Sequence, residues 1–379
     1  MKKVFLGSVW LVFYTFLGYP AIMALLARTR ARPVRTQADY APPVTLVVVA
    51  YNEEDVIGSK LENCRGLEYP PELLEVLVVA DGSDDATAER ARAAEGVRVL
   101  HRPERQGKLA AMNRALEAAS ADVIVFSDAN NHYSANALRA LVAPFADPAV
   151  GVVTGRKAID DGHGRALDRA EGLYWRYESK LKEWESATGS VTGVAGEALA
   201  FRREAYRSPR AGTMNDDFVQ ALLAALDGWR VVYAPEAVSL ERASATIADE
   251  ATRRSRLVTG RWQALRELLP IAIRRNPRLA WQVVSHKGLR PLVPFAMIVA
   301  AASNAALTRR AAWARMLLVL QAVFYGAALA GRESERRGRR NRLLYLPYYF
   351  CRMNVATLGG IRNFFAHRHE AVWAKVRRG

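Results

Sequence analysis

Residues 44–54 read VTLVVVAYNEE, in which a run of β-branched and apolar residues ends abruptly in Tyr-Asn-Glu-Glu. A short run of this kind is typical of a strand that is buried on both faces. The pattern recurs downstream, and the strands that it predicts are 44–50, 76–80, 97–100, 123–127 and 151–154. Helical patterns alternate with these strands, at 53–65, 84–94, 107–119 and 134–145. This alternation predicts an α/β fold with a mostly parallel sheet covered by helices on both faces.

Polar clusters follow three of the predicted strands. They are Tyr51-Asn52-Glu53-Glu54, Asp81-Gly82-Ser83-Asp84-Asp85 and Asp128-Ala129-Asn130. One Asp-Gly pair alone would indicate only a common tight turn. In parallel sheets, however, ligands bind beyond the carboxyl ends of the strands. Three clusters at that one end therefore indicate a binding site.

Both ends of the chain carry long apolar runs. Residues 4–27 contain no charge. The length of this run is close to the ~20 residues that span a bilayer and exceeds that of a signal peptide core. Two further candidates, 291–307 and 311–331, predict a membrane hairpin. The apolar segment 343–361 contains Pro347 and Arg352, and its sequence leaves open whether it spans, re-enters or lies in the interface.

The domain organisation follows from these runs. Between the catalytic part and the C-terminal spans lies a basic stretch in which Trp262, Leu265, Leu268 and Leu269 recur at helical spacing. It predicts an amphipathic helix on the membrane surface. The expected units are an N-terminal transmembrane anchor at 1–30, a catalytic domain at 40–250, a membrane-interface linker at 251–290 and a C-terminal transmembrane or interfacial region at 291–379.

The charge of the chain is strongly positive, at +16 from 54 basic and 38 acidic residues. Much of the excess flanks the apolar segments, which suits an anionic cytoplasmic leaflet better than nucleic acid; aromatic RNA-binding motifs are also absent. Four arginines follow the first apolar run and outnumber Lys2 and Lys3 before it, and a second arginine-rich stretch lies at 332–342. The positive-inside rule therefore predicts a multi-pass cell-membrane protein with a cytoplasmic catalytic domain and no nucleic-acid partner. Cys64 and Cys351 imply no disulfide framework or metal site.

Six motifs together resemble glycosyltransferase family 2, from residue 43 to about 260. They are VTLVVVAYNEE (44–54), ADGSDD (80–85), RQGKLAAMN (105–113), FSDAN (126–130), TGVAGEALAFRREAY (192–206) and NDDFVQALLAALDGWRVVYAPEA (215–237). The resemblance implies a GT-A fold, with a Rossmann-like, mostly parallel sheet. It also implies a nucleotide-sugar donor, a divalent cation (Mg²⁺ or Mn²⁺) and inversion at the anomeric carbon.

The resemblance also implies a donor site. Asp81 matches the carboxylate that the family uses to accept hydrogen bonds from the base, usually uracil, and Asp128 matches the first acid of its metal motif. Lys108 follows Gly107, where backbone and ammonium can approach a phosphate. The alternatives are a turn or capping role for the two aspartates and a solvated surface position for the lysine. The full set of expected donor-binding residues is Ala50, Tyr51, Glu53, Asp81, Lys108, Asp128 and Arg256.

Asp216 and Asp217 align with the Glu-Asp pair of the family, whose second member is the catalytic base. A sugar hydroxyl is a poor nucleophile, so a carboxylate must remove its proton as attack proceeds. Paired acids raise one another's proton affinity, which suits a base that works near neutral pH. The structural alternative is an N-cap for the helix predicted at 218–226, a role that Asp216 could fill.

Two further expectations concern the acceptor and the metal. Gly193 and Gly196 are expected in an acceptor loop, where small residues let a sugar or lipid approach; plain turn glycines are the alternative. Asn130 stands where the family usually has a second metal-binding aspartate, so the site lacks one negative charge. We expect Glu241, at the position where many members have a metal-reaching histidine, to supply that charge. The alternative is an exposed glutamate at a strand end.

Three functions fit the sequence. The first is transfer of a hexosyl or N-acetylhexosaminyl group (EC 2.4), once or a few times, from a UDP-sugar to a membrane-proximal or lipid-linked acceptor. The second is a processive polysaccharide synthase, but its QxxRW motif is replaced by residues 253–257, RRSRL, and three or four spans are few for a pore. The third is an inactive basic membrane-binding protein, against which the intact acids Asp81, Asp128 and Asp217 argue.

Overall fold

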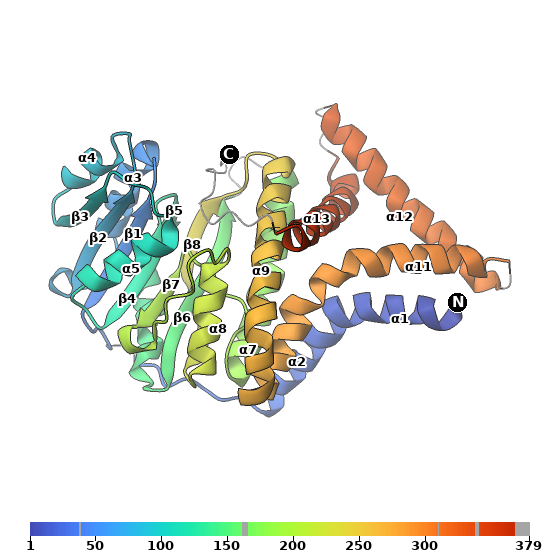
Figure 1. Ribbon diagram of the computed structural model, residues 1–379, viewed down its shortest axis with the longest axis horizontal. Coiled ribbons are helices and arrows are strands. Elements are labelled where there is room, and N and C mark those ends of the chain that lie inside the picture. The colour runs from blue at the N-terminus through green and yellow to red at the C-terminus, as the bar shows by residue number, and fades with distance from the viewer. Residues whose placement is uncertain (38, 161–165, 310, 338–340, 368–379) are drawn as a thin grey trace.

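The computed structural model describes residues 1–37, 39–160, 166–309, 311–337 and 341–367, and a mixed sheet forms its centre (Figure 1). In the described residues the strand order is β3-β2-β1-β4-β7-β6-β8-β5. The strands are β1 (Val44–Ala50), β2 (Leu74–Asp81), β3 (Val97–Arg102), β4 (Val123–Asp128), β5 (Asn131–Tyr133), β6 (Val150–Asp160), β7 (Leu199–Arg202) and β8 (Arg230–Arg242).

The first half of the sheet is parallel, as predicted. Strand β1 lies between β2 and β4, and β3 pairs with β2, all in parallel register. The residues of β1 are almost all buried, which explains why its sequence is a continuous apolar run rather than an alternating one. All five strands predicted from the sequence are present, with ends that differ by a few residues.

The second half of the sheet mixes directions. Strand β7 is antiparallel to both β4 and β6, β8 is parallel to β6, and β5 is antiparallel to β8. Strand β6 runs six residues beyond its predicted end at Thr154. This half places the end of β4, the loop before β7 and the distal part of β8 close together.

Helices cover both faces of the sheet (Figure 1). Helices α3 (Glu54–Arg65) and α6 (Ala137–Val142) pack on one apolar cluster with β1 and β4. Helices α5 (Lys108–Ala118) and α8 (Asp216–Leu226) pack on the other cluster. The helix α4 (Thr87–Arg92) is shorter than predicted and lies beside α3 and β3.

The stretch expected as a membrane-interface linker is instead packed on the catalytic domain. It forms α9 (Ile247–Arg275) and α10 (Pro277–Val283). Ala264, Leu268 and Val283 belong to the same buried cluster as the α8 residues. The apolar stripe of the helix faces the protein core, and contact of this stretch with a membrane surface stays a prediction. A further long helix, α7 (Ala166–Thr188), packs on β6, β8 and α2.

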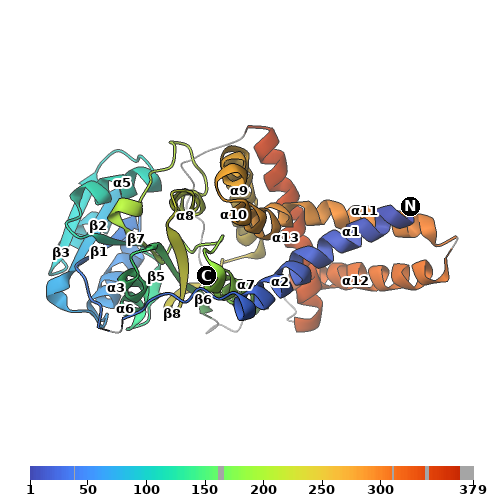
Figure 2. The same ribbon diagram turned by 90° about the horizontal axis from the view of Figure 1, so that it is seen from below.

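Three helical segments of the described chain are long and apolar enough to cross a membrane: Lys2–Thr29, Pro277–Leu307 and Ala312–Arg336. The first comprises α1 (Lys2–Phe13), a π-helical turn and α2 (Tyr19–Thr29). The second ends in α11 (Val293–Leu307), and the third is α12 (Ala312–Arg336). Figures 1 and 2 show α1, α11 and α12 projecting together from one side of the catalytic domain.

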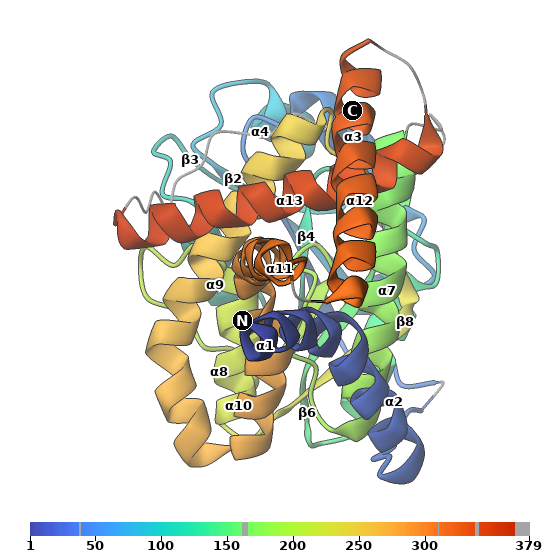
Figure 3. The ribbon, with the colours of Figure 1, turned by 90° about the vertical axis from the view of Figure 1, so that its right-hand side faces the viewer.

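The last helix, α13 (Arg342–Phe365), is not among the candidate spans. It packs along α9 and against α12. Figure 3 shows it running across the view while α11 is seen end-on, so α13 is transverse to the apolar helices. Of the arginine-rich stretch noted in the sequence, Arg339 and Arg340 lie outside the described residues.

Candidate active site

A cavity of about 640 Å³ lies between the carboxyl end of β4, the starts of α5 and α8, and one face of α9. It brings together most of the residues that the sequence singled out. Those that line it are Lys108, Asp128, Gly193, Gly196, Asp216, Asp217, Glu241 and Arg256. The lining does not include Ala50, Tyr51, Glu53, Asp81 or Asn130.

Asp81 does not line the cavity itself, but its carboxylate accepts hydrogen bonds from backbone groups that do. It ends β2, is 2% exposed, and pairs with Arg114 at 2.8 Å. It also accepts hydrogen bonds from the backbone N–H groups of Gln106 (3.1 Å) and Gly107 (2.6 Å), both of which line the cavity. Gly107 has φ 92°, a left-handed conformation that favours glycine. Asp81 thus shapes the turn that leads into Lys108, and its contact with a base stays a prediction.

The polar clusters after β1 and β2 are joined to each other. Asn52 exchanges hydrogen bonds with Asp84, of 2.7 and 3.1 Å, and the Glu53 N–H donates to Thr87. The guanidinium of Arg105 lies 3.7 Å from the centre of the Tyr51 ring. Tyr51 and Glu53 therefore lie at the same sheet edge as the cavity, as the strand-end argument predicts, and their donor contacts stay a prediction.

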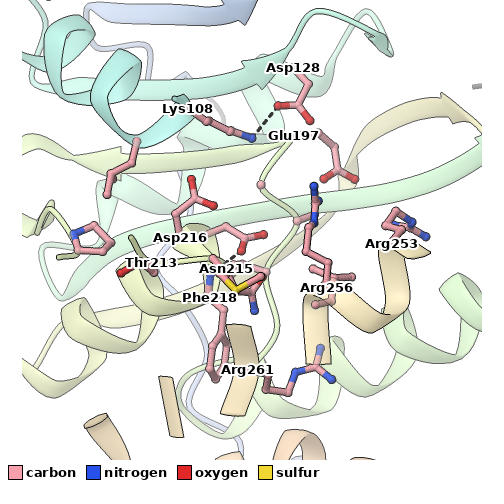
Figure 4. A pocket seen from close by; sticks show the side chains of 18 of the residues that line it. Lys108, Asp128, Glu197, Thr213, Asn215, Asp216, Phe218, Arg253, Arg256 and Arg261 are labelled. Atoms are coloured by element: carbon pink, nitrogen blue, oxygen red, sulfur yellow. Dashed lines mark hydrogen bonds and ion pairs between the residues drawn. The ribbon is translucent and has the colours of Figure 1, made fainter. Parts of the chain in front are cut away.

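Lys108 and Asp128 form an ion pair of 2.7 Å across the cavity (Figure 4). Burial alone would lower the pKa of Lys108, but the carboxylates of Asp128, Asp216 and Asp217 raise it above its ordinary value. The ammonium is therefore a fixed positive charge in the site. The position is partly buried and faces three acids, so it is not a solvated surface lysine.

Asp216 and Asp217 occupy the first turn of α8, and the N-cap is Asn215 rather than Asp216. Asp217 accepts a hydrogen bond from the Phe218 N–H at 2.7 Å. Burial, and then the charge of Asp216, raise the pKa of Asp217 to about 6. A carboxylate with this pKa is ionised at neutral pH and has more affinity for a proton than an ordinary aspartate, as a general base requires.

Gly196 is packed against this acid. A Cβ at position 196 would lie 3.0 Å from Asp217 Oδ2. At Gly193 a Cβ would meet the Lys287 ammonium at 2.6 Å. Both glycines therefore permit close approaches at the wall of the cavity, which a plain turn role does not explain.

Cations from α9 form another wall of the cavity. Arg253 is held by Glu250, whereas Arg256 interacts electrostatically with Asp128, Asp216 and Asp217. Figure 4 shows Arg256 pointing toward the acids and Arg261 lying farther from them. Arg256 therefore faces the acids of the site, and its contact with the donor phosphates stays a prediction, since the family's QxxRW motif is absent.

Oxygen ligands for a divalent cation are few in this site. Asp128 ends β4, and the Oδ1 atom of Asn130 is buried without a hydrogen-bond partner in the described chain. Within the described ranges no cluster of three or more Asp, Glu, His or Cys residues could hold a metal. Magnesium and manganese in nucleotide sites commonly take one or two protein ligands together with phosphates and water, so Asp128 and Asn130 fit such a site.

Glu241 is not an exposed strand-end residue. It is 2% exposed, lies opposite Asn131 in the sheet register, and its carboxylate contacts the ammonium of Lys157. Lys157 also lies 3.3 Å from Glu197. The negative charge of Glu241 thus has a cation beside it, which is a sufficient reason for its presence. Its role as a metal ligand stays a prediction.

Several further residues that line the cavity come from α7 and from the second candidate span, and their sequence did not predict this position. They are Tyr174, Glu178, Lys182 and Lys287. Glu178 accepts from Lys287 at 3.0 Å and pairs with Arg290, and the Lys182 ammonium lies 4.7 Å from the centre of the Tyr233 ring. Charged residues at i and i+4 of a helix ordinarily indicate a solvated face, so only the folded arrangement identifies them.

Comparisons with known proteins agree with this geometry. The family model "Glycosyl transferase family 2" matches residues 45–208. A beta-monoglucosyldiacylglycerol synthase from Trichormus variabilis is 28% identical over 235 residues, which cover 59% of this chain and 50% of that protein. A poly-beta-1,6-N-acetyl-D-glucosamine synthase from Staphylococcus aureus is 27% identical over 205 residues, covering 52% and 48%. The chain thus spans about half the length of these relatives.

A solved structure extends the likeness to nearly the whole chain. A mannosyltransferase from Pyrobaculum calidifontis, in complex with GDP-Man and Mn²⁺, matches with a TM-score of 0.72 and 26% identity. The match covers 97% of this chain and 100% of that one. The sheet and helices are those of the GT-A fold. Together with the six motifs and the paired acids at the cavity, these findings show that the chain is similar to family 2 glycosyltransferases over residues 45–208 and has their GT-A fold.

Proposed function

We propose that this protein transfers a sugar from a nucleotide diphosphate donor to a hydroxyl group of a membrane-proximal acceptor, with inversion at the anomeric carbon. The observation that carries the proposal is Asp217, whose pKa of about 6 suits a general base, in the same cavity as Lys108 and Asp128. A UDP-sugar is the expected donor, and the GDP-Man in the similar mannosyltransferase makes a GDP-sugar the second candidate.

The residues of the cavity have different roles in the proposed reaction. Asp217 accepts the proton of the acceptor hydroxyl while the oxygen of that hydroxyl forms a bond to the anomeric carbon. The bond between that carbon and the diphosphate oxygen breaks on the opposite side, and its electron pair leaves with the nucleotide. Lys108 and Arg256 balance the charge that develops on the diphosphate.

Asp128 and Asn130 would hold a divalent cation, magnesium or manganese. When bound, the cation supplies positive charge to the leaving diphosphate. The buried, unpartnered Asn130 Oδ1 supports this assignment, and so does the Mn²⁺ in the similar mannosyltransferase.

The acceptor is expected at the membrane, on the cytoplasmic side. The three candidate spans support a multi-pass arrangement. Figure 2 shows the N-terminus, the end of α11 and the start of α12 at the end of the projecting helices that is far from the catalytic domain. The transverse α13, which carries Arg352 and Arg362, fits a position along the membrane surface. Lipid-linked or lipid acceptors fit this placement better than soluble ones.

A donor screen tests the proposal. Membranes that contain the full chain are incubated with UDP- and GDP-sugars and Mn²⁺, and nucleotide release and labelled lipid products are measured. We expect release with one nucleotide class and a product carrying one or a few sugars. Absence of release with every donor, or release that is equal for Asp217→Asn, would overturn the proposal. A high-molecular-mass product would favour the processive alternative.

A further inference from the structure

The cavity contains more buried positive charge than the proposed reaction at the donor uses. Lys182 is 3% exposed, and its ammonium has no hydrogen-bond partner within the described chain. The ammonium lies 4.7 Å from the centre of the Tyr233 ring. Arg261 lines the same cavity, and its Nε is buried and likewise unpartnered among the described residues.

Both cations belong to the end of the cavity formed by α7 and the second candidate span. Lys182 interacts electrostatically with Glu178, Glu197 and Lys287, and Arg261 interacts with Tyr174, Arg254, Arg290 and Glu178. Neither has Asp128, Asp216 or Asp217 among its main electrostatic neighbours. Figure 4 shows Arg261 well separated from the Lys108–Asp128 pair.

The carboxylates at this end are already engaged. Glu178 is bonded to Lys287 and Arg290, and Glu197 lies 3.3 Å from Lys157. A buried cation without a counter-ion is costly, and it either loses its proton or waits for an anion. Burial lowers the pKa of Lys182 to about 8, so the amine still holds its proton over most of the neutral range. Arg261 keeps its proton at any physiological pH, because burial lowers its pKa only to about 10.

We propose that the acceptor is a phosphate-bearing lipid, and that Lys182 and Arg261 bind its phosphate at the membrane end of the cavity. This inference rests on the proposed glycosyl transfer and adds the chemical class of the acceptor. The donor diphosphate has its own cations in Lys108 and Arg256, which face the acids. A neutral lipid acceptor such as diacylglycerol would leave Lys182 and Arg261 unpaired.

The placement of the cations fits a lipid. Lys287, which lines this end of the cavity, belongs to the apolar segment Pro277–Leu307, a candidate for crossing the membrane. The phosphate of a lipid lies at the membrane surface, between its acyl chains and its headgroup hydroxyls. A phosphate held by Lys182 and Arg261 would direct those hydroxyls toward Asp217.

A binding experiment on the full chain tests the inference. The protein, in detergent micelles, is saturated with Mn²⁺ and with UDP or GDP, whichever binds, and glycerol phosphate is then titrated with glycerol as the neutral control. Because a charge-assisted hydrogen bond typically contributes about tenfold or more to affinity, we expect Lys182→Gln and Arg261→Gln each to weaken glycerol phosphate binding by at least about tenfold. Lys182→Arg, which keeps the positive charge, should retain most of the affinity for glycerol phosphate.

The control is Lys180→Gln, on the same helix, because the Lys180 side chain is 57% exposed and pairs with Glu183 at the surface. It should bind glycerol phosphate as the unmodified protein does. Equal affinities for glycerol phosphate and glycerol would overturn the inference, and so would equal effects of Lys182→Gln and Lys180→Gln. The same titration is repeated without nucleotide. Glycerol phosphate that binds only in the absence of nucleotide would assign these cations to the donor diphosphate instead.

A second arm identifies the source of the phosphate. Phosphatidylglycerol or diacylglycerol is added to the micelles, and displacement of glycerol phosphate is measured. We expect displacement by phosphatidylglycerol only; displacement by neither would refute a lipid source. Nucleotide binding and sugar transfer are measured in the same preparations. Their absence would overturn the proposed function, whereas intact transfer to neutral lipids with no phosphate effect would overturn only the inference.

Discussion

Gly196 lies so close to Asp217 that a Cβ at position 196 would be 3.0 Å from the Oδ2 atom of the acid. The loop before β7 and the first turn of α8 thus pack against one another beside Asp217, the acid that we propose as the general base. Gly196→Ala should displace the carboxylate by a few tenths of an ångström and reduce turnover by about tenfold or more, because misplaced catalytic groups lose rate steeply.

The measurement is transfer rate, with donor affinity and Tm recorded on the same samples. Gly58→Ala on α3 is the matched control, since a Cβ there meets nothing within 4 Å. Equal rates for the two variants would show that Gly196 has no part in positioning the base.

Removal of the base itself is the second prediction. Asp217→Asn keeps the size of the side chain but cannot accept the hydroxyl proton, so transfer should fall by at least about 10²-fold while nucleotide binding persists. Asp227→Asn, at the other end of α8, controls for loss of one acid, since Asp227 pairs only with Arg207 outside the cavity. An Asp217→Asn enzyme that turns over at near the normal rate would refute the assignment.

The pH profile gives the third prediction. Since Asp217 acts in its ionised form and its pKa is about 6, kcat/KM should be constant above that pH and fall about tenfold per unit below it. The charge of Asp216 contributes to the raised pKa. Asp216→Asn should therefore move the midpoint to lower pH, and a midpoint that stays in place or rises would contradict the coupling.

The fourth prediction concerns Glu241. Its contact with Lys157 predicts that Glu241→Gln lowers Tm, and its expected role as a metal ligand predicts that the same change raises the manganese concentration needed for activity. Lys157 still has Glu197 beside it, so the loss of stability should be smaller than the roughly 3–5 kcal/mol typical of an uncompensated buried charge. Glu236→Gln, an exposed position on the same strand, is the control. An unchanged manganese titration in Glu241→Gln would refute the metal-ligand role and leave the pairing with Lys157 as the function of this acid.

Membrane topology provides the fifth prediction. In a variant without Cys64 and Cys351, single cysteines replace Glu95 on the catalytic domain, Glu335 near the end of α12 and Arg309 between α11 and α12, all three exposed. A membrane-impermeant thiol reagent added to intact cells should label position 309 and spare the other two. Labelling of 95 or 335, with 309 protected, would reverse the orientation.

The parallel half of the sheet could be predicted because its strands are buried on both faces and therefore read as continuous apolar runs. In the other half, only β6 was predicted. Strand β5 has three residues, including the exposed His132, and β8 contains Pro235, which argues against a strand. Strand β8 nevertheless carries Glu241 to the cavity.

The donor end of the cavity could be predicted from loops that follow strands, since Lys108 and Asp128 are fixed by local sequence. The other end depends on tertiary packing. Nothing in the sequence around Lys182 distinguishes it from the exposed Lys180, two residues earlier. Only the packing of α7 against β8 and the second candidate span removes Lys182 from water.

The packing of α9 and α10 on the catalytic core has a consequence for biosynthesis. All the strands of the described sheet have been synthesised by Arg242, but Ala264, Leu268 and Val283, which complete one of its two apolar clusters, come later. Val283 is part of the segment that continues into α11. Helix α9 packs on α8, so a chain that ends before α9 would leave apolar side chains of α8 uncovered. Truncated versions that lack α9 and α10 should therefore aggregate.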